Sequence, residues 1–190
     1  MLGREHISKA LAQCQRKEHS LDEFPGFTRA AVLIPLFHTK EELSILLTVR
    51  TDEVETHKGQ ISFPGGMQDM SDTDAIRTAL REAEEELGIT RSDIEILGLL
   101  DDMPVPSKFI ITPVVGYLKD RPVCSPNLTE VAEVFDVPLA FFADEKNGRT
   151  EERELQGKKF AIWHFQYGKH IIWGATAGMI RNLIEVARRR

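Results

Sequence analysis

The sequence contains few of the features that would mark a secreted or membrane protein. Only two cysteines occur among its 190 residues, Cys14 and Cys124, and their positions fit no metal-binding spacing. Two isolated cysteines favour reduced thiols over a disulfide. No stretch approaches the roughly 18 apolar residues of a membrane span, and residues 1–5 lack the start of a signal peptide. We therefore expect a cytoplasmic protein that does not bind membranes.

An excess of positive charge is also missing. Lys and Arg total 24 against 30 Asp and Glu, a formal net charge of −6 at pH 7. A nucleic-acid-binding protein would carry a basic face, so this balance argues against such a partner. Apolar residues make up 42% of the chain, which is enough for one good core. We expect a single domain over residues 1–190, with 1–24 as an N-terminal helical extension.

The most informative stretch is 59–89, where a glycine turn precedes a helical pattern. Apolar residues at helical spacing form one narrow stripe, which consists of Ile76, Ala79, Leu80, Ala83 and Leu87. Gly88 can end this helix, and the candidates for capping its start are Ser71, Asp72 and Asp74. The pattern predicts a helix of about four turns with one face in the core.

A second face of this helix carries Glu82, Glu85 and Glu86, whereas Glu84 points elsewhere. Acids in a last helical turn oppose the helix dipole at roughly 0.3–1 kcal/mol each, and like charges four residues apart repel. Arg81 can reach Glu85, but one arginine cannot neutralise three acids. Divalent cations are the natural counter-charge, and oxygen ligands suit Mg²⁺ or Mn²⁺. The alternative is a solvated acidic face.

The glutamates belong to a longer pattern. Gly66, five residues, Asp72 and then Arg81-Glu-Ala-x-Glu-Glu-x-Gly-Ile89 closely resembles the Nudix box, the signature of hydrolases that cleave nucleoside diphosphates linked to another moiety. Asp72 stands where the consensus has Glu, and eight rather than seven residues separate it from Arg81. The resemblance implies an α/β fold, the Nudix-type α/β/α sandwich around a mixed β-sheet. It also implies metal ions held by Glu82, Glu85, Glu86 and the Gly66 carbonyl.

A second resemblance lies upstream of the box. Leu46-Leu-Thr-x-Arg50, followed by Gly59 and 63–66 (Phe-Pro-Gly-Gly), is similar to the extended motif of the coenzyme A diphosphatase branch of the family. That branch usually has Ser or Ala after this arginine and another Arg four residues before the glycine. Here those residues are Thr51 and Glu55. The candidate substrate contacts are Arg50, His57, Lys58 and Phe63, although basic residues in loops are often only solvated.

The segment 127–139 is similar to a Nudix segment in which a glutamate precedes a strand that ends in Val-Pro-Leu. Glu130 is therefore a candidate metal ligand or general base, with Glu133 second; both could instead be ordinary polar positions of a half-exposed strand. The resemblance implies attack of water on a diphosphate, with Glu82 or Glu130 as the base. The predicted catalytic residues are Arg81, Glu82, Glu85, Glu86 and Glu130, and the predicted metal ligands are Gly66, Glu82, Glu85, Glu86 and Glu130.

The remaining pattern predicts the scaffold. An amphipathic helix over 7–14 is expected to cover a sheet face, with a homodimer contact as the alternative. Strands at 30–37 and 43–50 form a hairpin, in which Pro35 indicates an edge or a bulge. Further elements are strands at 94–100, 109–118, 160–167 and 170–173, a short helix at 138–143, and a helix from 174. The loop 101–108 is expected to face the substrate.

The resemblance implies hydrolysis of coenzyme A or its thioesters to 3′,5′-ADP and a 4′-phosphopantetheine fragment. One alternative is the same reaction on another nucleotide, such as ADP-ribose, NADH or a dinucleoside polyphosphate. Another is a binding module of the same fold that has lost catalysis, but such a module would not need mutually repelling acids.

Overall fold

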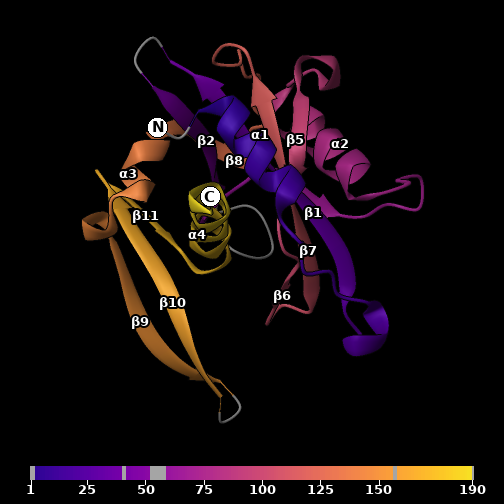
Figure 1. Cartoon of the computed structure of the whole chain (residues 1–190). Helices are drawn as coiled ribbons and strands as arrows, with labels where there is room; N and C mark the ends of the chain where they lie inside the picture. The colour runs from indigo at the N-terminus through magenta and orange to yellow at the C-terminus, as the bar shows by residue number, and fades with distance from the viewer. Residues whose placement is uncertain (1–2, 40–41, 52–58, 156–157, 190) are drawn as a thin grey trace.

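The computed structural model describes residues 3–39, 42–51, 59–155 and 158–189, with the backbone alone for 153–155 and 158–160. The helices are α1 (Arg4–Gln13), α2 (Ala75–Leu87), α3 (Leu139–Ala143) and α4 (Gly174–Arg188) (Figure 1). The strands are β1 (Thr28–His38), β2 (Leu43–Arg50), β3 (Ile61–Ser62), β4 (Gly65–Met67), β5 (Glu95–Leu99), β6 (Met103–Val105), β7 (Phe109–Leu118), β8 (Val131–Pro138), β9 (Gly148–Leu155), β10 (Lys158–Tyr167) and β11 (His170–Trp173).

Two sheets are built from these strands. The larger follows the order β3-β2-β1-β7-β5, and β8, β4 and β6 pair with β2, β1 and β7 respectively. β1 runs parallel to β7 and antiparallel to β2 and β4, so the larger sheet is mixed, as predicted. The smaller sheet, β11-β10-β9, is antiparallel (Figure 1).

Both faces of the larger sheet are covered because its strands are apolar on both sides. Along β1, Leu33 and Phe37 pack into one core cluster with the apolar stripe of α2. Ile34 and Leu36 point the other way, into a cluster with α1 and α4. Strand side chains alternate between faces, so a continuous apolar run is what a sheet between two helical layers requires. The α/β/α sandwich is therefore confirmed.

The N-terminal helix covers this second face. Ile7, Ala10 and Leu11 are buried, and α1 packs against α4 and β5. Gly98 permits the close approach: a Cβ there would lie 2.9 Å from the Cβ of Leu11, and its φ of 154° is one that other residues rarely adopt. In the described part of the chain, no helix has the length and apolar character needed to cross a membrane.

Two scaffold predictions need correction. Pro35 is neither on an edge nor at a bulge of the β1–β7 pairing, because β1 lies inside the sheet and its register with β7 is continuous, with Pro35 opposite Gly116. On the other side of β1, the pairing with β4 covers 30–32 and that with β2 covers 36–38, so the proline falls between them, where its missing N–H costs no ladder bond. The loop 101–108 contains a strand, β6, which pairs with β7.

Candidate active site

The helix α2 begins and ends where the sequence indicates. Asp74 caps it, because its Oδ1 accepts a hydrogen bond from the Arg77 N–H at 2.9 Å. Gly88 ends it in the left-handed conformation, with φ of 67°. Ala79, Ala83 and Leu87 are fully buried. The side of the helix next to this stripe carries Glu82 and Glu86, and α2 packs against β4 as well as β1.

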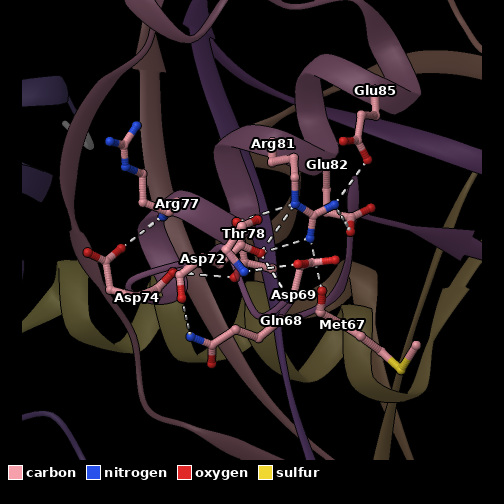
Figure 2. A network of polar contacts seen from close by, with 11 residues as sticks. Met67, Gln68, Asp69, Asp72, Asp74, Arg77, Thr78, Arg81, Glu82 and Glu85 are labelled. Carbon is pink, nitrogen blue, oxygen red and sulfur yellow. Dashed lines mark hydrogen bonds and ion pairs between the residues drawn. The ribbon is translucent and has the colours of Figure 1, made fainter.

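Arg81 is the centre of a polar network on this side of α2 (Figure 2). Its Nη2 lies 2.9 Å from Oδ2 of Asp72 and 3.0 Å from the Met67 carbonyl oxygen. Its Nη1 donates to Oε1 of Glu82 at 2.7 Å and to Oε2 of Glu85 at 3.0 Å. The hydrogen bonds from Arg81 hold the pKa of Asp72 below its usual value. One guanidinium therefore connects the β4–α2 loop with two of the predicted carboxylates.

Gly66 lies directly against Glu82. A Cβ on this glycine would lie 2.6 Å from Oε1 and 2.7 Å from Cδ of Glu82. Gly66 pairs with Ala31 of β1, and this pairing fixes the position of the β4 backbone next to α2. The absence of a side chain is thus what lets a carboxylate reach the backbone of β4. Burial raises the pKa of Glu82, and the hydrogen bond from Arg81 opposes this rise.

Glu86 is the buried carboxylate of the site, with 3% of the residue exposed. Loss of solvation raises its pKa to about 8, and the negative charges of Glu82 and Glu130 add to that rise. Opposing influences come from the positive charge of Arg50 and from the nearby backbone N–H of Gly65. The Nη1 of Arg50 lies 4.0 Å from Oε1 of Glu86, beyond hydrogen-bond distance.

The segment between β7 and β8 brings Glu130 to the end of α2. The Ser125 N–H donates to the Leu87 carbonyl and the Asn127 N–H to the Glu86 carbonyl, both at 2.8 Å. The N–H of Thr51 donates to the Glu130 carbonyl at 2.9 Å. Glu130 consequently acts electrostatically on both Glu82 and Glu86.

The predicted carboxylates differ in burial. Glu82 and Glu130 both raise the pKa of Glu86 by their negative charges. Glu85 acts in the same way on Glu82, but its side chain is 57% exposed and bonded to Arg81. As placed, no three His, Cys, Asp or Glu side chains among the described residues are arranged to hold a metal ion. The glutamate side chains stay apart because Arg81 binds Glu82 and because their negative charges repel one another.

The donor set nevertheless suits a hard divalent cation. All candidate donors are carboxylate or carbonyl oxygens, the ligands that Mg²⁺ and Mn²⁺ prefer. Glu86 is a buried acid beside two others, and its cationic neighbour Arg50 is not in hydrogen-bond contact. A bound cation would offset this destabilised charge. Proteins with the Nudix box typically use a divalent metal ion.

Two other predicted residues lie elsewhere. Phe63 is 2% exposed and packs in the core with α4, so its side chain is not on the site surface. Glu133 pairs with Lys169 at 2.9 Å and His170 at 3.2 Å, on a different surface. The predicted contacts His57 and Lys58, and the unusual Glu55, fall outside the described residues.

A cavity of about 490 Å³ lies near the start of α2, and its lining includes Arg16, Arg29 and Ile76. The glutamates of the candidate site, Glu82, Glu85, Glu86 and Glu130, do not line it.

Two residues of the site carried no functional prediction. Asp72 was predicted only as a possible cap, and the structure makes it the partner of Arg81. Its position in the box was the available signal. Asn127 bonds the side chains of Thr129 and Glu130, which lie two and three residues along the chain. The available signal was an asparagine at the start of a turn, but its backbone bond to Glu86 could not be seen in the sequence.

Comparison with known proteins agrees with this geometry. Residues 27–156 match the family model for the NUDIX domain, so the chain belongs to the Nudix hydrolases, a family of enzymes. It is 40% identical over 171 residues to "Nudix hydrolase 15, mitochondrial" of Arabidopsis thaliana, covering 85% of this chain and 59% of that protein. It is 36% identical to "Uncharacterized Nudix hydrolase NudL" of Photorhabdus laumondii, covering 82% and 83%.

A solved structure supports the fold. The MutT/nudix family protein from Enterococcus faecalis aligns over 93% of this chain and 64% of its own, with a TM-score of 0.52 and 16% identity. The Arabidopsis relative is named as mitochondrial, so the predicted cytoplasmic location stays a prediction. The same holds for the predicted homodimer and for the single domain over 1–190.

Proposed function

We propose that Glu82, Glu86 and Glu130 bind Mg²⁺ or Mn²⁺, with Glu85 and the Gly66 carbonyl as further ligands, for hydrolysis of a diphosphate linkage. The observation that carries this proposal is the buried carboxylate of Glu86, whose pKa is raised to about 8 by burial beside two other acids. An unfavourable cluster of this kind is typical of a functional site rather than of a scaffold.

We assign two tasks to the residues of this chain: they accept a proton from the attacking water, and they orient the reacting groups. A divalent ion at the site supplies positive charge where negative charge develops on the phosphate oxygens. Glu130 or Glu82 accepts the proton of the attacking water. Arg50 can bind a phosphate oxygen, because its Nε is buried and lacks a hydrogen-bond partner among the described residues. Arg81 keeps Glu82 oriented.

The substrate that we propose is coenzyme A or acyl-coenzyme A, which would yield 3′,5′-ADP and the (acyl-)4′-phosphopantetheine. The support is the upstream motif, two parts of which lie at the carboxylates: Arg50 ends β2 beside Glu86, and the backbone of Gly65 acts electrostatically on the same carboxylate. Hydrolysis of ADP-ribose, NADH or a dinucleoside polyphosphate is the alternative substrate class, and a binding module without catalysis is the alternative role.

A hydrolysis panel tests this proposal. The protein with Mg²⁺ or Mn²⁺ is incubated with coenzyme A, acetyl-coenzyme A, NADH, ADP-ribose and diadenosine polyphosphates, and the products are separated by chromatography. We expect 3′,5′-ADP from coenzyme A, and none when a chelator is present. Preferential cleavage of another nucleotide would make that nucleotide the substrate in place of coenzyme A. Binding without cleavage of any member would identify a binding module.

A further inference from the structure

We infer that Asn127 is a positioning residue, which fixes the carboxylate of Glu130 beside the carboxylates of α2. The inference rests on the proposed function, because it assumes that Glu130 takes part in hydrolysis. Asn127 lies before β8 and is not one of the acidic residues of the site. Its importance comes from the number of bonds that converge on it.

The backbone of Asn127 joins the two parts of the site. Its N–H donates to the carbonyl of Glu86 at 2.8 Å, which attaches the segment to the last turn of α2. Its carbonyl accepts from the N–H groups of Glu130 at 2.9 Å and Val131 at 2.8 Å. The peptide groups of the two glutamates are therefore both bonded to the same residue.

The side chain of Asn127 has one orientation that satisfies its neighbours. Its Oδ1 accepts from Thr129, at 3.2 Å from the N–H and 2.8 Å from the hydroxyl Oγ1. Since a backbone N–H can only donate, the oxygen of the amide must face Thr129. The amide nitrogen therefore faces Glu130, where Nδ2 donates to Oε1 at 3.1 Å. This bond fixes one oxygen of the carboxylate.

A substitution can separate this role from that of a residue that only holds the turn. Asn127→Asp keeps the size of the side chain and the acceptor that Thr129 needs. It removes the donor to Glu130 and places a second negative charge beside that carboxylate. A turn-holding residue would tolerate the change, whereas a residue that orients Glu130 would not. Asn127→Ala loses both interactions.

The experiment is a double-mutant cycle between Asn127→Asp and Glu130→Gln, with whichever nucleotide the wild type hydrolyses. We expect Asn127→Asp to lower kcat by about 30–100-fold with KM changed less than about threefold, since general-base catalysis contributes about 10²–10⁴-fold. In the Glu130→Gln background the same change should cost less than about threefold. Asn147→Asp is the matched control. Its amide bonds the Phe141 carbonyl at 3.0 Å, outside the site, so its kcat should not change.

A crystal structure of Asn127→Asp supplies a readout that is independent of activity. We expect the backbone of 125–131 to stay in place and the Glu130 carboxylate to turn away from residue 127. An unmoved carboxylate, a kcat close to that of wild type, or an equal loss in both backgrounds would overturn the inference alone. If Glu130→Gln itself kept full activity, the proposed role of Glu130 and this inference would both fall.

Discussion

Asp72 and Arg81 form a two-point ion pair across the β4–α2 loop. The Nη2 of Arg81 lies 2.9 Å from Oδ2 of Asp72, and its Nε lies 3.3 Å from Oδ1 (Figure 2). The Asp72 side chain is only 6% exposed. The pair leaves Nη1 of the same guanidinium free to bond Glu82. Arg81 therefore still positions Glu82, although this box has Asp72 in place of a glutamate and one extra residue before Arg81.

We predict that Asp72→Asn destabilises the protein and lowers turnover. Losing the charge leaves a partly buried guanidinium with a weaker partner, which costs about 1–3 kcal/mol of unfolding free energy. Arg81 also loses the anchor that orients Glu82. Denaturant unfolding and steady-state kinetics measure both effects. Glu84→Gln, which weakens an exposed pair with Arg91, is the control and should change stability by less than about 1 kcal/mol. Equal effects of the two substitutions would contradict this account.

The adjacent glycines of β4 should respond differently to alanine. A Cβ on Gly65 would lie 2.5 Å from the backbone oxygen of Ala31, so Gly65→Ala should destabilise the protein by about 1–3 kcal/mol. The three atoms nearest to a Cβ on Gly66 all belong to the carboxylate of Glu82, the end of a flexible side chain, so Gly66→Ala should mainly lower kcat. Thermal unfolding and kinetics of both variants distinguish the two effects. A Gly66→Ala variant with normal turnover would show that the close approach of Glu82 is unimportant.

The raised pKa of Glu86 predicts how stability depends on pH in the metal-free protein. Its pKa rises from 4.5 to about 8 on folding, so between these values the folded state holds a proton that the unfolded state has lost. Stability therefore falls as pH rises through this window. Relative to Glu86→Gln, wild type should lose about 2–3 kcal/mol between about pH 5 and about pH 7.5. Parallel pH profiles of the two unfolding free energies would refute the assignment.

The glutamates of α2 should differ in their importance for turnover. Glu86→Gln removes a carboxylate that we propose binds the metal, at nearly constant shape, and should lower kcat by at least ~10²-fold, as for loss of one preorganised electrostatic group. Glu85→Gln should cost less, because the Glu85 side chain is 57% exposed and bonded to Arg81. Glu84→Gln should be close to wild type. The reverse order in single-turnover kinetics would place the site on the exposed side of the helix.

The sequence predicted most of the elements because their signals are local. The apolar stripe and the capping residues were sufficient for α2, and continuous β-branched runs were sufficient for β1, β2 and β7. The α/β/α layering was implied by the resemblance to the Nudix box, and the apolar runs agree with it because they need cover on both faces. The prediction from Pro35 was wrong because a sheet edge is only one of the places where a missing N–H is tolerated. A gap between two partners of an interior strand is another, and it depends on pairing that the sequence does not display.

The site was predictable where the chemistry follows helical spacing and not where it depends on distant contacts. Glu82 and Glu86 followed from the box. Spacing and the box both predicted that Glu85 joins them, and its greater exposure and its bond to Arg81 could not be seen in the sequence. Phe63 was predicted to contact substrate because it belongs to the upstream motif, yet its side chain packs in the core. The role of Asn127 was inferred from its side-chain bond to Glu130 together with its backbone bond to Glu86 of α2.

The dependence of hydrolysis on metal tests the central claim most directly. The protein is stripped with a chelator, and the rate of 3′,5′-ADP release from coenzyme A is followed as Mg²⁺ is added back, in wild type and in Glu86→Gln. Our account predicts no release without the metal, saturable recovery in wild type, and at least ~10²-fold less recovery in the variant. Full hydrolysis by the stripped protein, or equal recovery in the two proteins, would contradict it.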